Sequence, residues 1–233
     1  MRILAFETSA KAASVALAQD GQLLAESYQN TGLTHSQTLM SMAENLLHTC
    51  GCTPQDIDAV AVAAGPGSFT GVRIGVAAAK GFAWARELPC YGVSTLEAMA
   101  LNLGVHQGYI LPVMDARRSQ VYTALFHADC GNYTRIREDR AISLQELGED
   151  VQTLSEPIFL IGDGSLLCYN TLLEAVPNLV CPPEHRMHQR AAGVALAAFQ
   201  KIAAGEAGDG AALTPNYLRL SQAERERLAR EQL

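Results

Sequence analysis

The sequence predicts an α/β protein built from two tandem lobes of one design. The main observation is an element order that occurs twice: three strands, a helix, a buried strand, a glycine turn and a second helix. The second is composition, because 233 residues with 48% hydrophobic side chains can bury one large core or two small ones. We expect a first lobe over residues 1–106, a second over 107–213 and a tail helix over 214–233.

The first predicted elements are three antiparallel strands. Apolar runs at residues 2–6 and 13–17 are the first two strands, and the third covers 23–28. Asp20 and Gly21 between the last two form a hairpin turn signal. The three strands are therefore expected to form a meander.

An amphipathic helix follows the meander. Hydrophobic residues recur at helical spacing from Leu39 to Leu47, Thr34 and Gln37 offer a capping box, and Gly51 ends the helix. The next run covers residues 57–64 and is apolar except for Asp58, which is typical of a buried parallel strand.

A glycine turn then leads into a long helix. The turn is Gly65-Pro-Gly-Ser-Phe-Thr-Gly and the helix covers residues 72–86. A strand over residues 89–93 comes next, and Ser94 with Glu97 opens a further helix.

The same order then begins again. The strand at 109–116 matches the first strand, with Asp115 where Glu7 stood. The later counterparts are the strand at 120–126, the turn at 129–132, the capping pair Ser143 and Glu146, and the run at 157–165 that ends in Gly162-Asp-Gly-Ser.

This duplication predicts two ribonuclease-H-like lobes that face each other across a cleft. Such a pair is the architecture shared by actin, Hsp70 and the sugar kinases, the ASKHA superfold. Chance similarity between two ordinary α/β units is the alternative. If a nucleotide binds, we expect it at the strand ends and turns beside the cleft, namely Glu7, Thr8, Ser9, Asp115, Gly162 and Gly164.

The glycine turn before the long helix has two interpretations. A tight turn at a helix N-terminus directs backbone N–H groups and the helix dipole to one place, which suits an anion. No Gly-Lys-Ser/Thr follows, so the turn is not a P-loop. A purely structural strand-to-helix turn explains the same residues.

The helix over residues 72–86 is apolar on nearly every side, which indicates burial on two sides. The sheet covers one side of this helix, and either a neighbouring helix or another protein covers the second side. Small residues there would let a partner helix approach closely. The candidate partner interface consists of His35, Leu39, Met42, Arg73, Ile74, Ala77, Ala78, Lys80, Gly81 and Trp84.

Charge and composition exclude several classes of protein. The net charge of −7 argues against independent binding of tRNA, because nucleic-acid-binding proteins usually present a basic face. The six cysteines include no C-x-x-C pair and are expected to be reduced thiols. No apolar run is long enough for a membrane span, and Glu7 interrupts the first apolar segment before a signal-peptide core can form. We expect a cytoplasmic protein.

Several motifs together resemble the TsaB (YeaZ) family. These are Phe6-Glu-Thr-Ser, His35-Ser-Gln, Gly65-Pro-Gly-Ser-Phe-Thr-Gly-Val-Arg-Ile-Gly, Gly92-Val-Ser-Thr-Leu, Asp115-Ala-Arg with Val121-Tyr122, and Pro215-x-Tyr-Leu-Arg. The resemblance implies a two-lobed protein that pairs with a related catalytic subunit, TsaD, through helices of its first lobe. With an ATPase called TsaE, that subunit transfers a threonylcarbamoyl group from its adenylate to an adenosine beside the tRNA anticodon.

The resemblance also implies that this chain is not the catalytic member. The two metal-binding histidines of TsaD-type proteins align with Thr95 and Met99, which are not ligands for the same ion. Glu7 stands where most relatives have Asp, and Gln120 replaces a usual Glu. We expect no catalytic residue, no metal site and no cofactor of its own, with ATP used by the partner subunits.

The predicted role is that of a scaffold. Its partners are TsaD directly and TsaE within the complex, with a homodimer when the chain is alone; tRNA is reached only through the complex, and no membrane is involved. The alternative is a stand-alone ATP-dependent small-molecule kinase or ATPase of the same superfold. Its support is the duplicated lobe with the acidic strand ends Glu7 and Asp115.

Overall fold

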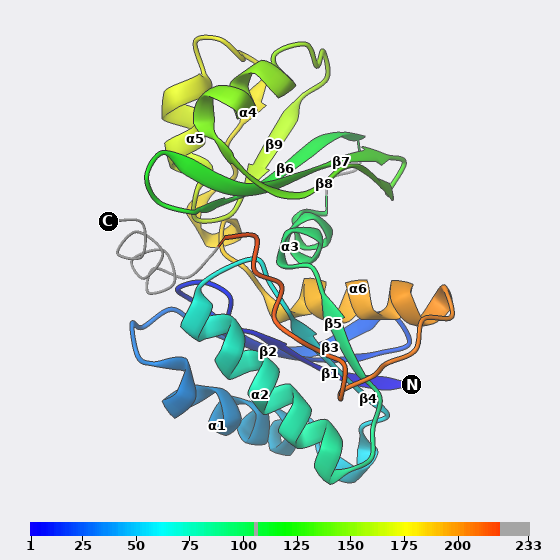
Figure 1. Cartoon of the computed structure of the whole chain (residues 1–233). Coiled ribbons are helices and arrows are strands. Elements are labelled where there is room, and N and C mark those ends of the chain that lie inside the picture. The colour runs from blue at the N-terminus through cyan, green and yellow to red at the C-terminus, as the bar shows by residue number, and fades with distance from the viewer. Residues whose placement is uncertain (105–106, 220–233) are drawn as a thin grey trace.

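Two five-stranded mixed sheets form the centres of two lobes in the computed structural model, which describes residues 1–104 and 107–219 (Figure 1). The first sheet contains β1 (Arg2–Glu7), β2 (Ala13–Gln19), β3 (Gln22–Gln29), β4 (Ala59–Ala63) and β5 (Cys90–Val93). The second contains β6 (Gln107–Asp115), β7 (Gln120–Asp129), β8 (Asn132–Ser143), β9 (Ile158–Ile161) and β10 (Leu179–Val180).

The two sheets have the same strand order, which confirms the predicted tandem α/β fold. The first runs β3-β2-β1-β4-β5 and the second β8-β7-β6-β9-β10. In each sheet the first three strands are antiparallel neighbours, and the first strand also pairs in parallel with the fourth. The chain therefore builds one topology twice.

Helices cover both faces of each sheet. They are α1 (His35–Thr49), α2 (Phe69–Ala85), α3 (Thr95–Leu103), α4 (Leu144–Val151), α5 (Ser165–Leu172) and α6 (Ala191–Ala203), with short 3-10 turns at Pro54–Asp56 and Glu184–Arg186. Helices α1 and α2 lie on the outer face of the first sheet, α4 and α5 on the outer face of the second, and α3 and α6 lie between the sheets (Figure 1). No helix of the described segments has the length and apolar character needed to cross a membrane.

Alternating side chains on the strands supply a core on each face of a sheet. In β1, Leu4 and Phe6 pack towards α1 and α2, whereas Ile3 and Ala5 pack towards α6. In β6, Leu111 belongs to the core under α4 and α5. The central parallel pairs, β1 with β4 and β6 with β9, are thus buried on both faces, as the apolar runs in the sequence predict.

The inner helices are exchanged between the lobes. Helix α3 follows the first sheet in the chain but packs on β6, β7 and β9 of the second. Helix α6 follows the second sheet but packs on β1, β2 and β4 of the first. The predicted boundaries at residues 106 and 213 stay a prediction, but they do not describe this packing, since α6 lies in the predicted second lobe.

The ends of the helices agree with most of the predicted caps. The capping box of Ser143 and Glu146 forms at α4, and the Ser94 hydroxyl accepts a hydrogen bond from Glu97 N at 3.2 Å at α3. Thr34 begins α1 without a side-chain cap, so the predicted box with Gln37 is wrong. Gln37 N instead donates to the Thr34 backbone carbonyl at 3.0 Å.

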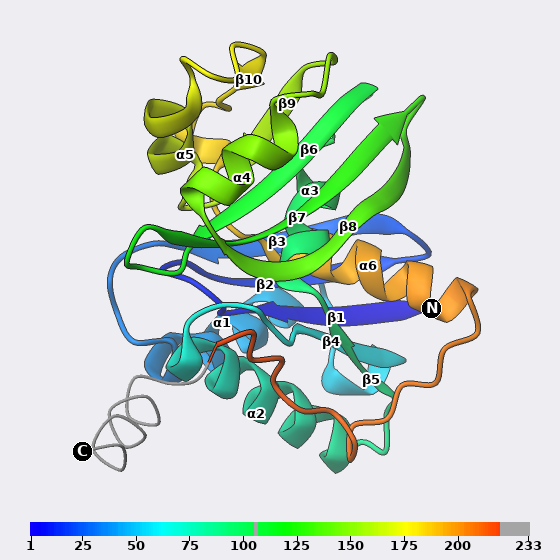
Figure 2. The ribbon, with the colours of Figure 1, turned by 45° about the horizontal axis from the view of Figure 1, so that its top comes forward.

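After α6 the chain returns along the first lobe as an extended segment, residues 206–219, which we call the strap. It runs beside β5 and then along α2 towards the gap between the lobes (Figure 2). Cys90 N donates to the Gly208 carbonyl at 3.4 Å, and Asn216 N donates to the Ala64 carbonyl at 2.6 Å. Of the tail helix predicted over residues 214–233, the described part, residues 214–219, is not helical and belongs to the strap. The rest of that predicted helix lies outside the described residues.

Candidate functional site

Helix α2 presents one flank to the first sheet and another to solvent. Val72, Val76 and Ala79 are buried in the core beneath it. On the opposite flank Ala77 and Gly81 are exposed, and the Trp84 side chain is 86% exposed. A Cβ added at Gly81 would meet no atom within 4 Å. This exposed flank, consisting of Ala77, Gly81 and Trp84, is the part of the predicted interface that another protein can reach.

Two residues of the predicted interface are core side chains. Leu39 is 1% exposed and Met42 is 9% exposed, and both pack in the core between α1 and the first sheet. Their helical spacing places them on the inward stripe of α1, so they cannot contact a partner directly. The exposed apolar residue of the same helix is Met40, which is 47% exposed.

Three other predicted interface residues are partly engaged within the chain. Ile74 and Ala78 are half-buried against the core of the first lobe. His35 is also half-buried, and its Nε2 lies 2.9 Å from the Ala10 carbonyl oxygen. Ile74 and Ala78 therefore border the exposed flank of α2 rather than forming it.

The two cations of the predicted interface bind the strap. Arg73 Nε donates to the Tyr217 hydroxyl at 2.7 Å, and its guanidinium lies over the Phe69 ring at 3.7 Å. Lys80 Nζ donates to the Leu213 carbonyl at 3.0 Å and to the Ala211 carbonyl at 3.3 Å. Sequence periodicity could not identify these contacts, because the strap is far from α2 in the chain.

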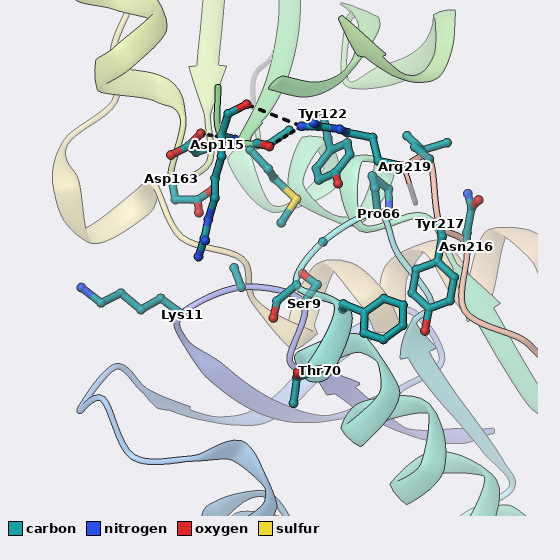
Figure 3. Close-up of a pocket in the computed structure, with 18 residues that line it drawn as sticks. Ser9, Lys11, Pro66, Thr70, Asp115, Tyr122, Asp163, Asn216, Tyr217 and Arg219 are labelled. Carbon is teal, nitrogen blue, oxygen red and sulfur yellow. Dashed lines mark hydrogen bonds between the residues drawn. The ribbon is translucent and has the colours of Figure 1, made fainter. Parts of the chain in front are cut away.

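A cavity of about 630 Å³ lies between the lobes (Figure 3). The β1–β2 turn, the start of α2, the β6–β7 turn and the strap all contribute to its wall. Its charged lining residues are Lys11, Asp115, Arg117, Asp163 and Arg219. Of the predicted nucleotide residues, Ser9 and Asp115 line this cavity.

The other predicted residues of the first strand end lie beneath the cavity. Glu7 is fully buried, and its Oε1 accepts a hydrogen bond from Ser9 N at 2.5 Å. Its Oε2 has no partner among the described residues. Burial raises the pKa of Glu7 to about 7. Thr8 is also fully buried and donates to the Gly71 carbonyl at 2.8 Å, so it ties the strand end to α2.

The matching turn of the second lobe contributes a residue that the sequence reasoning missed. Gly162 and Gly164 are buried, and Asp163 between them projects into the cavity. Asp163 is exposed to the cavity, but the surrounding walls partly desolvate its carboxyl and raise its pKa, against the lowering effect of the Gln189 amide at 3.5 Å. An acidic residue between two glycines after a buried strand was the available sequence signal.

The glycine turn before α2 is in close contact with the strap. Gly65 has a φ of +115°, and a Cβ at this position would collide with the Asn216 carbonyl oxygen. Ser68 caps α2 through its hydroxyl, which accepts from Gly71 N at 3.3 Å. The approach of the strap therefore explains the glycine at position 65 without a bound anion.

The two residues that align with the metal-binding histidines of TsaD-type proteins lie inside the fold. Thr95 and Met99 are both fully buried in α3. His185 and His188 flank the end of the second 3-10 turn. Within residues 1–104 and 107–219 no group of three or more His, Cys, Asp or Glu side chains is arranged to hold a metal ion.

Comparison with known proteins places the chain among tRNA-modification proteins. The family model for tRNA N6-adenosine threonylcarbamoyltransferase, TsaD, matches residues 29–226. The tRNA threonylcarbamoyladenosine biosynthesis protein TsaB of Bacillus subtilis is 35% identical over 228 residues, which are 96% of each chain. TsaB of Escherichia coli is 40% identical over 167 residues, 70% of this chain and 72% of the relative.

Solved structures share the fold of this chain. YeaZ from Pseudomonas aeruginosa has a TM-score of 0.74 and 25% identity, covering 93% of this chain and 99% of that protein. A putative N-acetylmannosamine kinase from Listeria monocytogenes has a TM-score of 0.50 at 12% identity, covering 88% and 100%. The second likeness concerns the fold alone and agrees with the predicted superfold of actin, Hsp70 and the sugar kinases.

Proposed function

Because this chain belongs to the TsaB family of tRNA threonylcarbamoyladenosine biosynthesis proteins, we propose that it is the non-catalytic partner subunit of the threonylcarbamoyl transferase. In this role it binds TsaD directly, and TsaE joins the complex. The complex transfers the threonylcarbamoyl group to the adenosine next to the tRNA anticodon. In the absence of TsaD the chain forms a homodimer through the same surface.

The observation that carries the proposal is the exposed flank of α2. Trp84 is 86% exposed, and the small residues Gly81 and Ala77 lie one and two helical turns away on the same flank. An exposed tryptophan is unfavourable in water, and tryptophan is among the residues that contribute most to protein interfaces. Small neighbours let a second helix approach the backbone closely, so the flank suits a helix-to-helix contact.

Three features of the cleft support a role without chemistry. Glu7 is sealed from the cavity and has no cation beside it among its hydrogen-bond partners. Thr95 and Met99 fill the positions aligned with the metal ligands of TsaD and are buried. The glycine turn at Gly65 is covered by the strap. We therefore propose that ATP is used by the partner subunits, with tRNA reached only through the complex, in the cytoplasm.

The test is to place charge and bulk on the exposed flank. The Gly81→Arg variant should bind TsaD of the same organism at least about tenfold more weakly, because an interface designed for a small residue must then bury a guanidinium. The matched control is Gly81→Ala, which fills little space and improves helix propensity. Calorimetric titration of each variant with TsaD gives the two affinities.

Reconstituted tRNA threonylcarbamoylation provides the second measurement. Product formation should require this chain, fall with Gly81→Arg and persist with Asp115→Ala, which alters the cavity but not α2. Equal TsaD affinity for the two Gly81 variants would refute the proposed surface. Loss of product with Asp115→Ala, while TsaD binding is intact, would instead favour the alternative in which the cleft acts on a nucleotide.

A further inference from the structure

We infer that the strap, residues 206–219, is a clasp that fixes the separation of the two lobes and thus the width of the cavity between them. The inference does not depend on any partner. It is based on three features: the anchors of the strap on α2, the glycines beneath it, and the contact that its end makes with the second lobe.

The strap is anchored along α2 from Phe69 to Lys80. Lys80 binds two of its carbonyl oxygens, at Ala211 and Leu213. About two and three turns from Lys80 towards the N-terminus of the helix, Arg73 and Phe69 hold Tyr217, whose ring stacks on Phe69 with centroids 4.7 Å apart. Although the strap has irregular structure, these side-chain contacts make it an ordered part of the fold.

Glycines in the first lobe leave room for the strap to pack closely against it. A Cβ added at Gly65 would collide with the Asn216 carbonyl oxygen, and one added at Gly92 would collide with the Leu213 side chain. Asn216 N also donates to the Ala64 carbonyl at 2.6 Å. The strand ends of β4 and β5 therefore carry residues without side chains where the strap crosses them (Figure 2).

The end of the strap crosses to the second lobe. The Arg219 guanidinium donates hydrogen bonds to the backbone carbonyl oxygens of Ala116 and Arg117, the second at 3.5 Å (Figure 3). Both carbonyls belong to the β6–β7 turn on the rim of the cavity. One continuous segment thus joins α2 in the first lobe to the β6–β7 turn in the second.

The turn that Arg219 holds is conformationally unfavourable. Arg117, Arg118 and Ser119 have φ values of +63°, +56° and +55°, a left-handed region that residues with a Cβ seldom occupy in succession. Arg117 N donates to Asp115 Oδ1 at 2.7 Å, and Gln120 N donates to the Arg117 carbonyl at 3.2 Å. The Arg219 guanidinium adds its hydrogen bonds to the Ala116 and Arg117 carbonyls to these contacts. Arg219 therefore stabilises the turn as well as the closure of the lobes.

The experiment compares Arg219→Ala with Arg118→Ala in the full chain. Arg118 lies in the same turn, and its side chain makes no hydrogen bond or ion pair with the described residues, so it controls for loss of charge. Amide hydrogen exchange of residues 115–120 should be about tenfold faster in Arg219→Ala than in Arg118→Ala, because charge-assisted hydrogen bonds are lost. Small-angle scattering should give a larger radius of gyration for Arg219→Ala than for Arg118→Ala.

Tyr217→Ala is the decisive second variant, because it keeps Arg219 but removes the anchor on α2 that lies nearest to Arg219. Faster exchange of residues 115–120 in both Arg219→Ala and Tyr217→Ala is the expected result, with unchanged exchange in β1 and β4 as the measure of intact folding. If neither variant differs from Arg118→Ala, the clasp is refuted. If only Arg219→Ala differs, Arg219 holds the turn locally and the strap does not control the lobes.

Discussion

At the end of β1 a carboxyl group is buried, and no cation among residues 1–104 and 107–219 compensates its charge. Glu7 is fully buried, and its pKa is raised from the usual 4.5 to about 7 because burial disfavours the charged form. A raised pKa means that the folded chain binds this proton more tightly than the unfolded chain. The free energy of unfolding therefore decreases as the pH rises from about 4.5 to about 7, and the loss persists above that range.

We predict that Glu7→Gln stabilises the protein in alkaline solution. The free energy of unfolding of the variant should exceed that of the wild type by about 3 kcal/mol at pH 8, and by much less at pH 5, where the wild-type carboxyl is protonated in the folded state. Urea denaturation at both pH values measures the two differences.

The control for this prediction is Glu44→Gln, since Glu44 is exposed on α1. Its effect on stability should be small and the same at both pH values. A Glu7→Gln difference that does not change between pH 5 and pH 8 would show that the Glu7 carboxyl titrates normally in the folded chain.

At the scale of single elements, α6 packs on an alanine layer. The core between this helix and the first sheet includes Ala5, Ala61 and Ala63 from the strands and Ala195 and Ala198 from the helix. Small side chains on both surfaces let the helix lie close to the sheet and leave no room for larger ones. This layer explains why α6 is apolar on almost every side, because α3 covers its other flank.

We predict that Ala61→Leu lowers the free energy of unfolding by about 1–3 kcal/mol, because three added carbon atoms overpack the layer. The control is Ala77→Leu on the exposed flank of α2, which should change stability by less than about 0.5 kcal/mol. Urea denaturation of the two variants checks the difference, and equal effects would contradict the tight alanine layer.

The sequence predicts the elements better than their partners. Strand positions, the glycine turn and the start of α4 follow from local signals such as apolar runs and the Ser143 cap, and the structure agrees. The exchange of α3 and α6 could not be predicted, because a helix that is apolar all round does not indicate which sheet it covers. The pairing of Arg73 with Tyr217 spans 144 residues, so no local pattern contains it.

The candidate partner surface shows the same division between local and non-local information. The apolar helix α2 was found from its composition, and Trp84, Gly81 and Ala77 are exposed there. Leu39 and Met42 were assigned to the surface although they form the inward stripe of α1. Hydrophobicity alone does not separate a core stripe from an interface, and only the position of the sheet distinguishes them.

At the scale of the whole molecule, each sheet depends on a helix from the other half of the chain. Without α6 the first sheet would expose its alanine face, and without α3 the second sheet would lose the core around Ile110 and Phe126. An α/β sheet needs both faces covered to be stable. The two lobes are therefore one folding unit, although their topologies are separate.

We predict that fragments 1–104 and 107–233 do not fold alone but assemble when they are expressed together. Each fragment by itself should show no cooperative thermal transition in circular dichroism, because one sheet face remains uncovered. The co-expressed fragments should elute as a single complex and regain a cooperative transition. A cooperative transition of fragment 1–104 alone would contradict the interdependence.

The exchange also determines what happens while the chain is being made. The strands of the first sheet are complete once Val93 has left the ribosome, but the helix that covers their inner face begins only at Ala191. At cellular rates of synthesis, translation of the residues between Val93 and Ala191 takes roughly 5–20 s. Throughout that interval the nascent chain carries a complete sheet with one uncovered apolar face. Chaperones that bind exposed apolar surfaces can bind this face.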